Sequence, residues 1–188
     1  MKTAVVLACA ILTAAPGFAA AAAAPSGAAA PAPTQTSEPT LENFGDWDVR
    51  CFPVKSGSPC EAIYLAVEKQ TRQRVTGVTV VYAPSQDRYI MQVAVPLGVS
   101  IPDGLVIQTS TFTTGKLPFR RCDEAGCYVE TAIDSKMIDA LKGASASRAD
   151  LAIVWASSKK AQLPLSLKGF GDAVANMVKQ ARERTKGS

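Results

Sequence analysis

Residues 75–95, with the sequence VTGVTVVYAPSQDRYIMQVAV, decide the fold class of this chain. They contain two runs rich in Val, Ile, Thr and Tyr, at 75–82 and 89–95, separated by Pro84-Ser85-Gln86-Asp87. Such runs are typical of β-strands, and a short segment of Pro, Ser and Asp between them is typical of a turn. This stretch therefore predicts two antiparallel strands.

The same pattern recurs over most of the chain. Short runs in which apolar and polar residues alternate are bounded by Gly, Pro, Ser or Asp, as in Pro102-Asp103-Gly104 and Thr114-Gly115. About nine short strands at such spacing predict an all-β antiparallel sandwich, immunoglobulin-like in class, and not a series of βαβ units. The other seven predicted strands are 47–52, 62–67, 105–109, 118–121, 128–132, 151–156 and 163–167.

Two segments break this pattern with helical spacing. In the first, predicted over 134–142, Asp134 is placed to cap the helix and Gly143 to end it. The second, predicted over 170–184, has apolar residues at i, i+3, i+4, i+7, i+8 and i+11 counted from Phe170. Its cations cluster at the C-terminal end, so a helix packed on the sheet is favoured over one on a membrane surface.

The N-terminus has the pattern of an export signal. Lys2 is followed by thirteen mostly apolar residues, 3–15, and then by a Pro-Gly break and small residues. We predict a signal peptide over residues 1–19, with cleavage somewhere in 19–24, and no stable transmembrane segment after cleavage. An uncleaved anchor is the alternative, which Pro16 and the weak hydrophobicity of alanine disfavour.

Residues 20–40 consist almost entirely of Ala, Pro, Ser and Thr. This composition cannot bury a core, so we predict a disordered tether that precedes a single domain over 41–184.

Four cysteines fall within the predicted domain: Cys51, Cys60, Cys122 and Cys127. In an exported protein an even number of cysteines favours disulfides over a metal site, although four cysteines allow three connectivities. The local pairs are favoured because the segments between them resemble turns. A zinc site made of all four thiolates is the alternative, and only one pair has a spacing typical of zinc ligands.

Composition excludes several classes of function. The chain has no histidine, which excludes Ser-His-Asp and Cys-His catalysis and imidazole ligands. Twenty Lys and Arg against sixteen Asp and Glu give a net charge of +4 without a dense basic block, so we expect no nucleic-acid partner. We also expect no cofactor, no metal and no catalytic residue.

Two arrangements are nevertheless candidates for catalysis without histidine. Asp46 and Asp48 would project on the same side of one strand, as paired carboxylates must for acid–base chemistry. Ser157 and Lys160 form an S-x-x-K pattern, but in a turn between strands instead of at a helix start. Both are interpreted as solvated surface.

Three stretches together resemble the invasion-associated locus B family of alphaproteobacteria. They are FGDWDVRC at 44–51 with Cys60; VPLGV at 95–99 followed by IPDGL at 101–105; and PFRRC at 118–122 with Gly126-Cys127 and the closing LSLKGF at 165–170. The resemblance implies an exported immunoglobulin-like β-sandwich, linked in the family's namesake to host-cell invasion, and it supplies no reaction or catalytic residue. We interpret the motif residues as structural: Trp47 and Trp155 as core anchors, Gly98 and Gly104 as turn glycines, and Phe170 as the residue that docks the last helix.

These observations predict an exported, non-enzymatic binding protein of the periplasm or envelope, with the outer membrane and the medium as alternative locations. The partner is an unknown protein or envelope component. The loops between Cys51 and Cys60 and between Cys122 and Cys127 are the expected contact surfaces, because loops on rigid sandwiches commonly carry recognition. The alternatives are a histidine-free enzyme and a structural or stress protein of the envelope.

Overall fold

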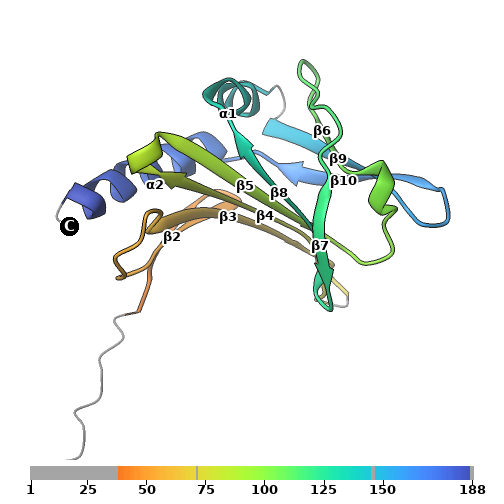
Figure 1. Ribbon diagram of the computed structural model, residues 1–188, viewed down its shortest axis with the longest axis horizontal. Helices are drawn as coiled ribbons and strands as arrows, with labels where there is room; N and C mark the ends of the chain where they lie inside the picture. The colour runs from red at the N-terminus through yellow and green to blue at the C-terminus, as the bar shows by residue number, and fades with distance from the viewer. Residues whose placement is uncertain (1–37, 71, 145–146, 187–188) are drawn as a thin grey trace, which may run out of the picture. The chain divides into compact units, whose positions relative to one another are not determined.

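Two antiparallel sheets and two helices make up the domain in the computed structural model, which describes residues 38–70, 72–144 and 147–186 (Figure 1). The predicted signal peptide and nearly all of the predicted tether lie outside the described residues.

The large sheet has seven strands in the order β1-β2-β3-β4-β5-β8-β7, and every neighbouring pair is antiparallel. Its first five strands follow one another along the chain, so each is joined to the next by a hairpin. The strands are β1 (Thr40–Phe44), β2 (Trp47–Cys51), β3 (Cys60–Val67), β4 (Arg74–Ala83), β5 (Arg88–Val95), β7 (Phe119–Asp123) and β8 (Gly126–Ile133).

The small sheet has three strands in the order β10-β9-β6, which are also antiparallel. Its strands are β6 (Val106–Gln108), β9 (Arg148–Val154) and β10 (Lys160–Ser166). The described residues also form two α-helices, α1 (Ser135–Lys142) and α2 (Phe170–Lys186), and the 3₁₀ turns η1 (Pro84–Gln86) and η2 (Ile101–Asp103).

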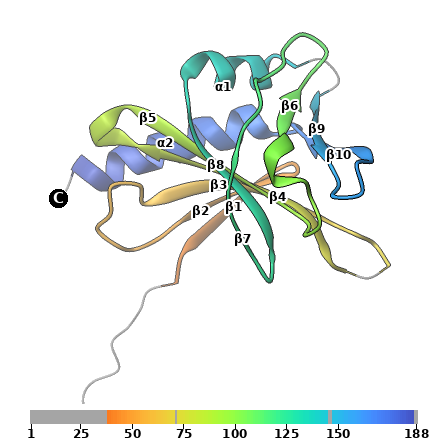
Figure 2. The same ribbon diagram turned by 45° about the vertical axis from the view of Figure 1, so that its right-hand side comes forward.

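One face of the large sheet forms the core. In register across four strands, Val49, Ala62, Val80 and Met91 are all buried. They belong to one hydrophobic cluster with residues of the small sheet and of both helices. Figures 1 and 2 show the small sheet, α1 and α2 on the same side of the large sheet, and α2 packs chiefly on β2 and β3.

The predicted all-β class and its elements are confirmed. The nine predicted strands correspond to β2 to β10, and both predicted helices are present. The Asp134 side chain accepts a hydrogen bond from the amide of Met137 at 2.9 Å, as expected of an N-cap. The tenth strand, β1, was not predicted, and it begins at the last residue assigned to the tether.

The two sheets are joined where the β1–β2 turn meets the end of β10, a contact that we call the sheet junction. The indole nitrogen of Trp47 donates a hydrogen bond to the carbonyl of Ser166 at 2.9 Å. The amide of Asp46 donates to the carbonyl of Lys168 at 3.1 Å, and the Ser166 hydroxyl donates to the Asp46 carboxylate at 2.6 Å. Three hydrogen bonds therefore link residues about 120 positions apart in the chain.

Close backbone approach at the sheet junction depends on Gly169. Its φ is +83°, and a Cβ atom added there would lie 1.8 Å from the carbonyl oxygen of Phe44. The next residue, Phe170, is 1% exposed and its ring lies 4.9 Å from that of Trp47, centroid to centroid. Glycine at 169 thus lets α2 start directly beneath the first hairpin.

We predict that Gly169→Ala lowers the free energy of unfolding by about 3 kcal/mol or more, because the added methyl group clashes with backbone at a positive φ. Gly57→Ala is the control, since Gly57 lies in an exposed loop with nothing within 4 Å of an added Cβ. It should leave the stability unchanged or raise it slightly. Urea unfolding of both variants measures the difference, and equal midpoints would contradict the importance of the sheet junction.

Candidate functional site

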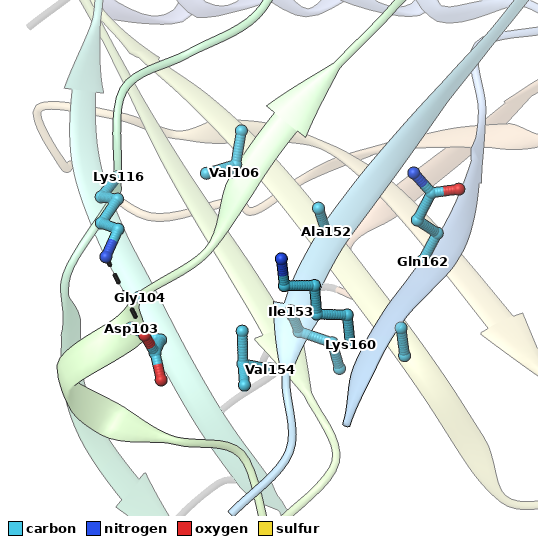
Figure 3. Close-up of a pocket in the computed structure, with 10 residues that line it drawn as sticks. Asp103, Gly104, Val106, Lys116, Ala152, Ile153, Val154, Lys160 and Gln162 are labelled. Atoms are coloured by element: carbon cyan, nitrogen blue, oxygen red, sulfur yellow. Dashed lines mark ion pairs between the residues drawn. The ribbon is translucent and has the colours of Figure 1, made fainter. Parts of the chain in front are cut away.

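An open groove of about 660 Å³ crosses the outward face of the small sheet (Figure 3). Its floor includes Val106 of β6 and Ala152 and Val154 of β9, all partly exposed. In β9 these positions alternate with Leu151 and Ile153, whose side chains are buried in the core. Strand alternation therefore presents a strip of small aliphatic side chains to solvent above the core.

One wall of the groove is the first half of β10. In the register of the sheet, Lys160 pairs with Val154, and Gln162 pairs with Ala152. Both side chains are exposed and rise beside the aliphatic floor, as Figure 3 shows. Among the described residues, no carboxylate lies within ion-pair distance of the Lys160 ammonium.

The opposite wall comes from η2 and the segment that follows β6. The Lys116 ammonium lies 3.9 Å from the Asp103 carboxylate, and the Ser100 hydroxyl donates to the same carboxylate at 2.6 Å. The Lys116 side chain is 69% exposed, so this ion pair contributes little to stability and leaves the ammonium accessible.

Gly104 brings Lys116 to the groove. Its φ is +65°, and an added Cβ would lie 2.7 Å from the carbonyl oxygen of Leu117. This close approach accompanies two backbone hydrogen bonds between Leu105 and Leu117, at 2.9 and 2.8 Å. The glycine predicted to serve a turn therefore also shapes the groove wall.

The groove thus combines a narrow aliphatic floor with two ammonium groups and one carboxylate. Because one of the lysines has the only carboxylate of the lining as its partner, the lining carries an excess of positive charge. Such a surface suits a ligand with apolar groups and a negative charge.

A second polar cluster lies where α2 passes the β4–β5 turn. The buried Tyr82 hydroxyl donates to the Asp87 carboxylate and accepts a hydrogen bond from Arg182 at 2.8 Å. Burial, reinforced by the neighbouring Tyr82 and Asp87, raises the pKa of Tyr89, whose ring centroid lies 5.0 Å from that of Tyr82. The hydrogen bonds of Tyr82, Asp87 and Arg182 are made to one another. We therefore assign this cluster the role of holding α2 on the large sheet.

The cysteines lie in two local pairs at disulfide distance, Cys51 with Cys60 and Cys122 with Cys127. In each pair the two residues are directly opposite one another on antiparallel strands. The pairs lie at opposite ends of the large sheet, because Cys127 pairs with the last residue of β5 whereas Cys60 lies at the start of β3 beside the end of β4. The loops between the paired cysteines, which were the expected contact surfaces, are therefore far apart, and neither of them lines the groove.

The two pairs differ in exposure. Cys51 and Cys60 are each 1% exposed, whereas in the other pair Cys127 is 2% exposed and Cys122 is exposed on the edge strand β7. Beside it, the amide of Ala125 donates to the Asp123 carboxylate at 2.9 Å, and this hydrogen bond lowers the pKa of Asp123.

The candidate catalytic arrangements are not assembled. The prediction that Asp46 and Asp48 project from one strand was wrong, because Gly45, with φ +66°, and Asp46 form the two-residue turn between β1 and β2. Asp46 is engaged in the sheet junction, and Asp48 accepts a hydrogen bond from Asn43 at 2.9 Å.

The two residues of the S-x-x-K pattern, Ser157 and Lys160, also do not form a common site. Lys160 lines the groove, but Ser157 lies in the β9–β10 turn and does not line it.

The residues interpreted as structural have different surroundings. Trp47 and Phe170 are each 1% exposed in the core. Trp155 is only partly buried, and it packs near Gly98, whose φ is +91°. The carbonyl of Gly98 accepts a hydrogen bond from the amide of Ala156 at 2.7 Å. Trp155 therefore covers the margin of the core and does not anchor it.

The family model for the invasion associated locus B (IalB) protein matches residues 47–178. The chain belongs to the invasion associated locus B family. The match begins at Trp47 of the sheet junction, and it contains every residue that lines the groove.

A solved structure in this family has the same fold. The crystal structure of invasion associated protein B from Bartonella henselae matches with a TM-score of 0.67 and 21% sequence identity, over 76% of this chain and 99% of that chain. At this identity the likeness shows the fold alone. No curated protein sequence matches the chain.

Neither a membrane-spanning helix nor a cluster of metal ligands occurs in the described residues. No helix in residues 38–70, 72–144 and 147–186 is both long and apolar enough to cross a membrane. In the same residues, no three Cys, Asp or Glu side chains are grouped as metal ligands would be.

We predict that Cys122 and Cys127 are reduced before Cys51 and Cys60, because a reductant reaches an exposed sulfur more readily than a buried one. Limited treatment of the folded protein with a phosphine, followed by iodoacetamide and peptide mass mapping, measures the order. Labelling of Cys51 and Cys60 first, or of all four cysteines together, would contradict it.

Proposed function

We propose that this protein is an exported, non-enzymatic binding protein of the bacterial envelope, and that the groove on the small sheet is its binding surface. The observation that carries the proposal is the combination, in one groove, of an aliphatic floor with Lys160, whose ammonium has no carboxylate partner among the described residues.

Binding is the function that this lining suits best. The floor residues Val106, Ala152 and Val154 have no nucleophilic or acid–base group, and the ammonium groups on the walls would attract a ligand of negative charge. The Asp103 carboxylate is already engaged by a hydroxyl and an ammonium. The family's name also records no reaction.

Export is supported by two features of different kinds. Residues 1–19 have the pattern of a signal peptide, and the domain has two cysteine pairs at disulfide distance, which persist in oxidising compartments. We propose the periplasm as the compartment, with residues 20–39 as a tether before β1. The link to host-cell invasion carried by the family's name remains a property of its namesake.

Export predicts a specific mass for the native protein. After osmotic release from cells, the intact mass should correspond to a chain that begins between residues 20 and 24 and is four hydrogens short of the fully reduced chain, since two disulfides form. A full-length mass with free thiols would contradict export.

Binding through the groove predicts position-specific crosslinking in the native envelope. Benzoylphenylalanine at position 162, on the groove wall, should give a discrete adduct on irradiation, whereas the same group at position 179, exposed on α2, should not. Lys160→Glu should abolish the adduct, and Ser157→Ala should leave it unchanged. Equal crosslinking at both positions, or dependence on Ser157, would overturn the proposal.

A further inference from the structure

We infer that the edge of β10 that borders the groove binds an extended segment of a partner polypeptide in which acidic and aliphatic residues alternate, and that the acidic side chains of this segment reach the lysines of the groove. This inference rests on the proposed function and names the chemical class of the partner.

The first half of β10 has a free hydrogen-bonding edge. Backbone hydrogen bonds from Leu167 to Ser147 at 2.7 Å and from Trp155 to Lys159 at 2.8 Å fix which residues of β10 bond to β9. Along an antiparallel strand, the residues that hydrogen-bond to one neighbour alternate with those whose backbone groups point away from it. In β10 the backbone groups of the odd-numbered residues therefore face β9, and those of the even-numbered residues face away from it. The backbone groups of Lys160 and Gln162 therefore point outward, and among the described residues they have no hydrogen-bond partner.

The second half of the same edge is closed. Pro164 also faces outward and has no amide to offer, as expected of proline on an edge strand. The outward carbonyl of Ser166 is occupied by the indole of Trp47. A partner strand can therefore pair only with the part of β10 that borders the groove.

The two faces of this edge specify alternate side chains of a partner strand. On the outward face it would meet Lys160 and Gln162, and on the core face it would meet Ala161 and Leu163, which are only partly buried. Side chains alternate between faces along a strand, so a matching segment has acidic residues facing outward and aliphatic residues facing the core.

Charge favours an acidic partner on the outward face. The Lys160 ammonium has no carboxylate partner among the described residues, and the exposed Lys116 ammonium lies across the groove. An acyl chain fits less well, because ligand pockets for such groups bury most of the ligand surface and this groove is open to solvent. Backbone pairing, in contrast, supplies affinity without enclosure.

The test is binding of a fluorescein-labelled Val-Glu-Val-Glu-Val peptide to the oxidised protein, measured by fluorescence anisotropy. We expect saturable binding, with no binding of Val-Lys-Val-Lys-Val. In the predicted pairing the glutamate amides face β10, so N-methylation of both glutamates should abolish binding without altering the protein.

Variants separate the edge from the charge. Gln162→Pro removes an outward amide, as Pro164 does naturally, and should weaken binding about fivefold, the value of one hydrogen bond. Lys160→Glu should weaken it at least about tenfold, whereas Lys179→Glu, the same charge change on α2, should alter it less than about twofold. Thermal unfolding of each variant verifies folding.

Three results would overturn the inference. The first is that the N-methylated peptide binds as tightly as the unmodified peptide. The second is that decanoate binds to the groove and the peptide does not. The third is that the protein associates with itself through β10 and that Gln162→Pro abolishes this association. If the crosslink from position 162 persists while the peptide does not bind, the proposed function stands and only the class of partner is wrong.

Discussion

The sheet junction is the contact on which the rest of the structure depends. It joins the first hairpin of the large sheet to the end of the small sheet, and glycine at 169 allows the backbones to meet there. Because α2 begins at the next residue, the same contact sets where that helix crosses the large sheet. The two ends of the domain sequence are thereby fixed against each other, which closes the core between the sheets.

The sheet junction also explains why only one part of β10 is available to a partner. At the Ser166 end, the strand is covered by Trp47 and Asp46. At the Lys160 end, no described element covers the edge, and the aliphatic strip of the groove lies beside it. The residues that stabilise the fold and the residues that we propose to bind a partner therefore lie at opposite ends of one short strand.

Local sequence patterns predicted nearly all of the fold but not the groove. Alternation and helical spacing are local signals, so nine strands and both helices were found. The strand β1, TLENF, was not predicted because four of its five residues are exposed and it follows a proline-rich segment. The groove combines residues of η2, β6, the 113–118 segment, β9 and β10, which only long-range pairing brings together. No motif marks Lys116, and Lys160 appeared only within an unrelated S-x-x-K pattern.

The most direct test of this account is amide hydrogen exchange along β10. In the free protein, the amides of Lys160 and Gln162 should exchange rapidly, and those of Ala161 and Leu163 should be protected by their bonds to β9. Addition of the Val-Glu-Val-Glu-Val peptide should slow exchange at Lys160 and Gln162 alone. Protection of these two amides in the free protein, or no change on addition of the peptide, would contradict a free edge that receives a partner strand.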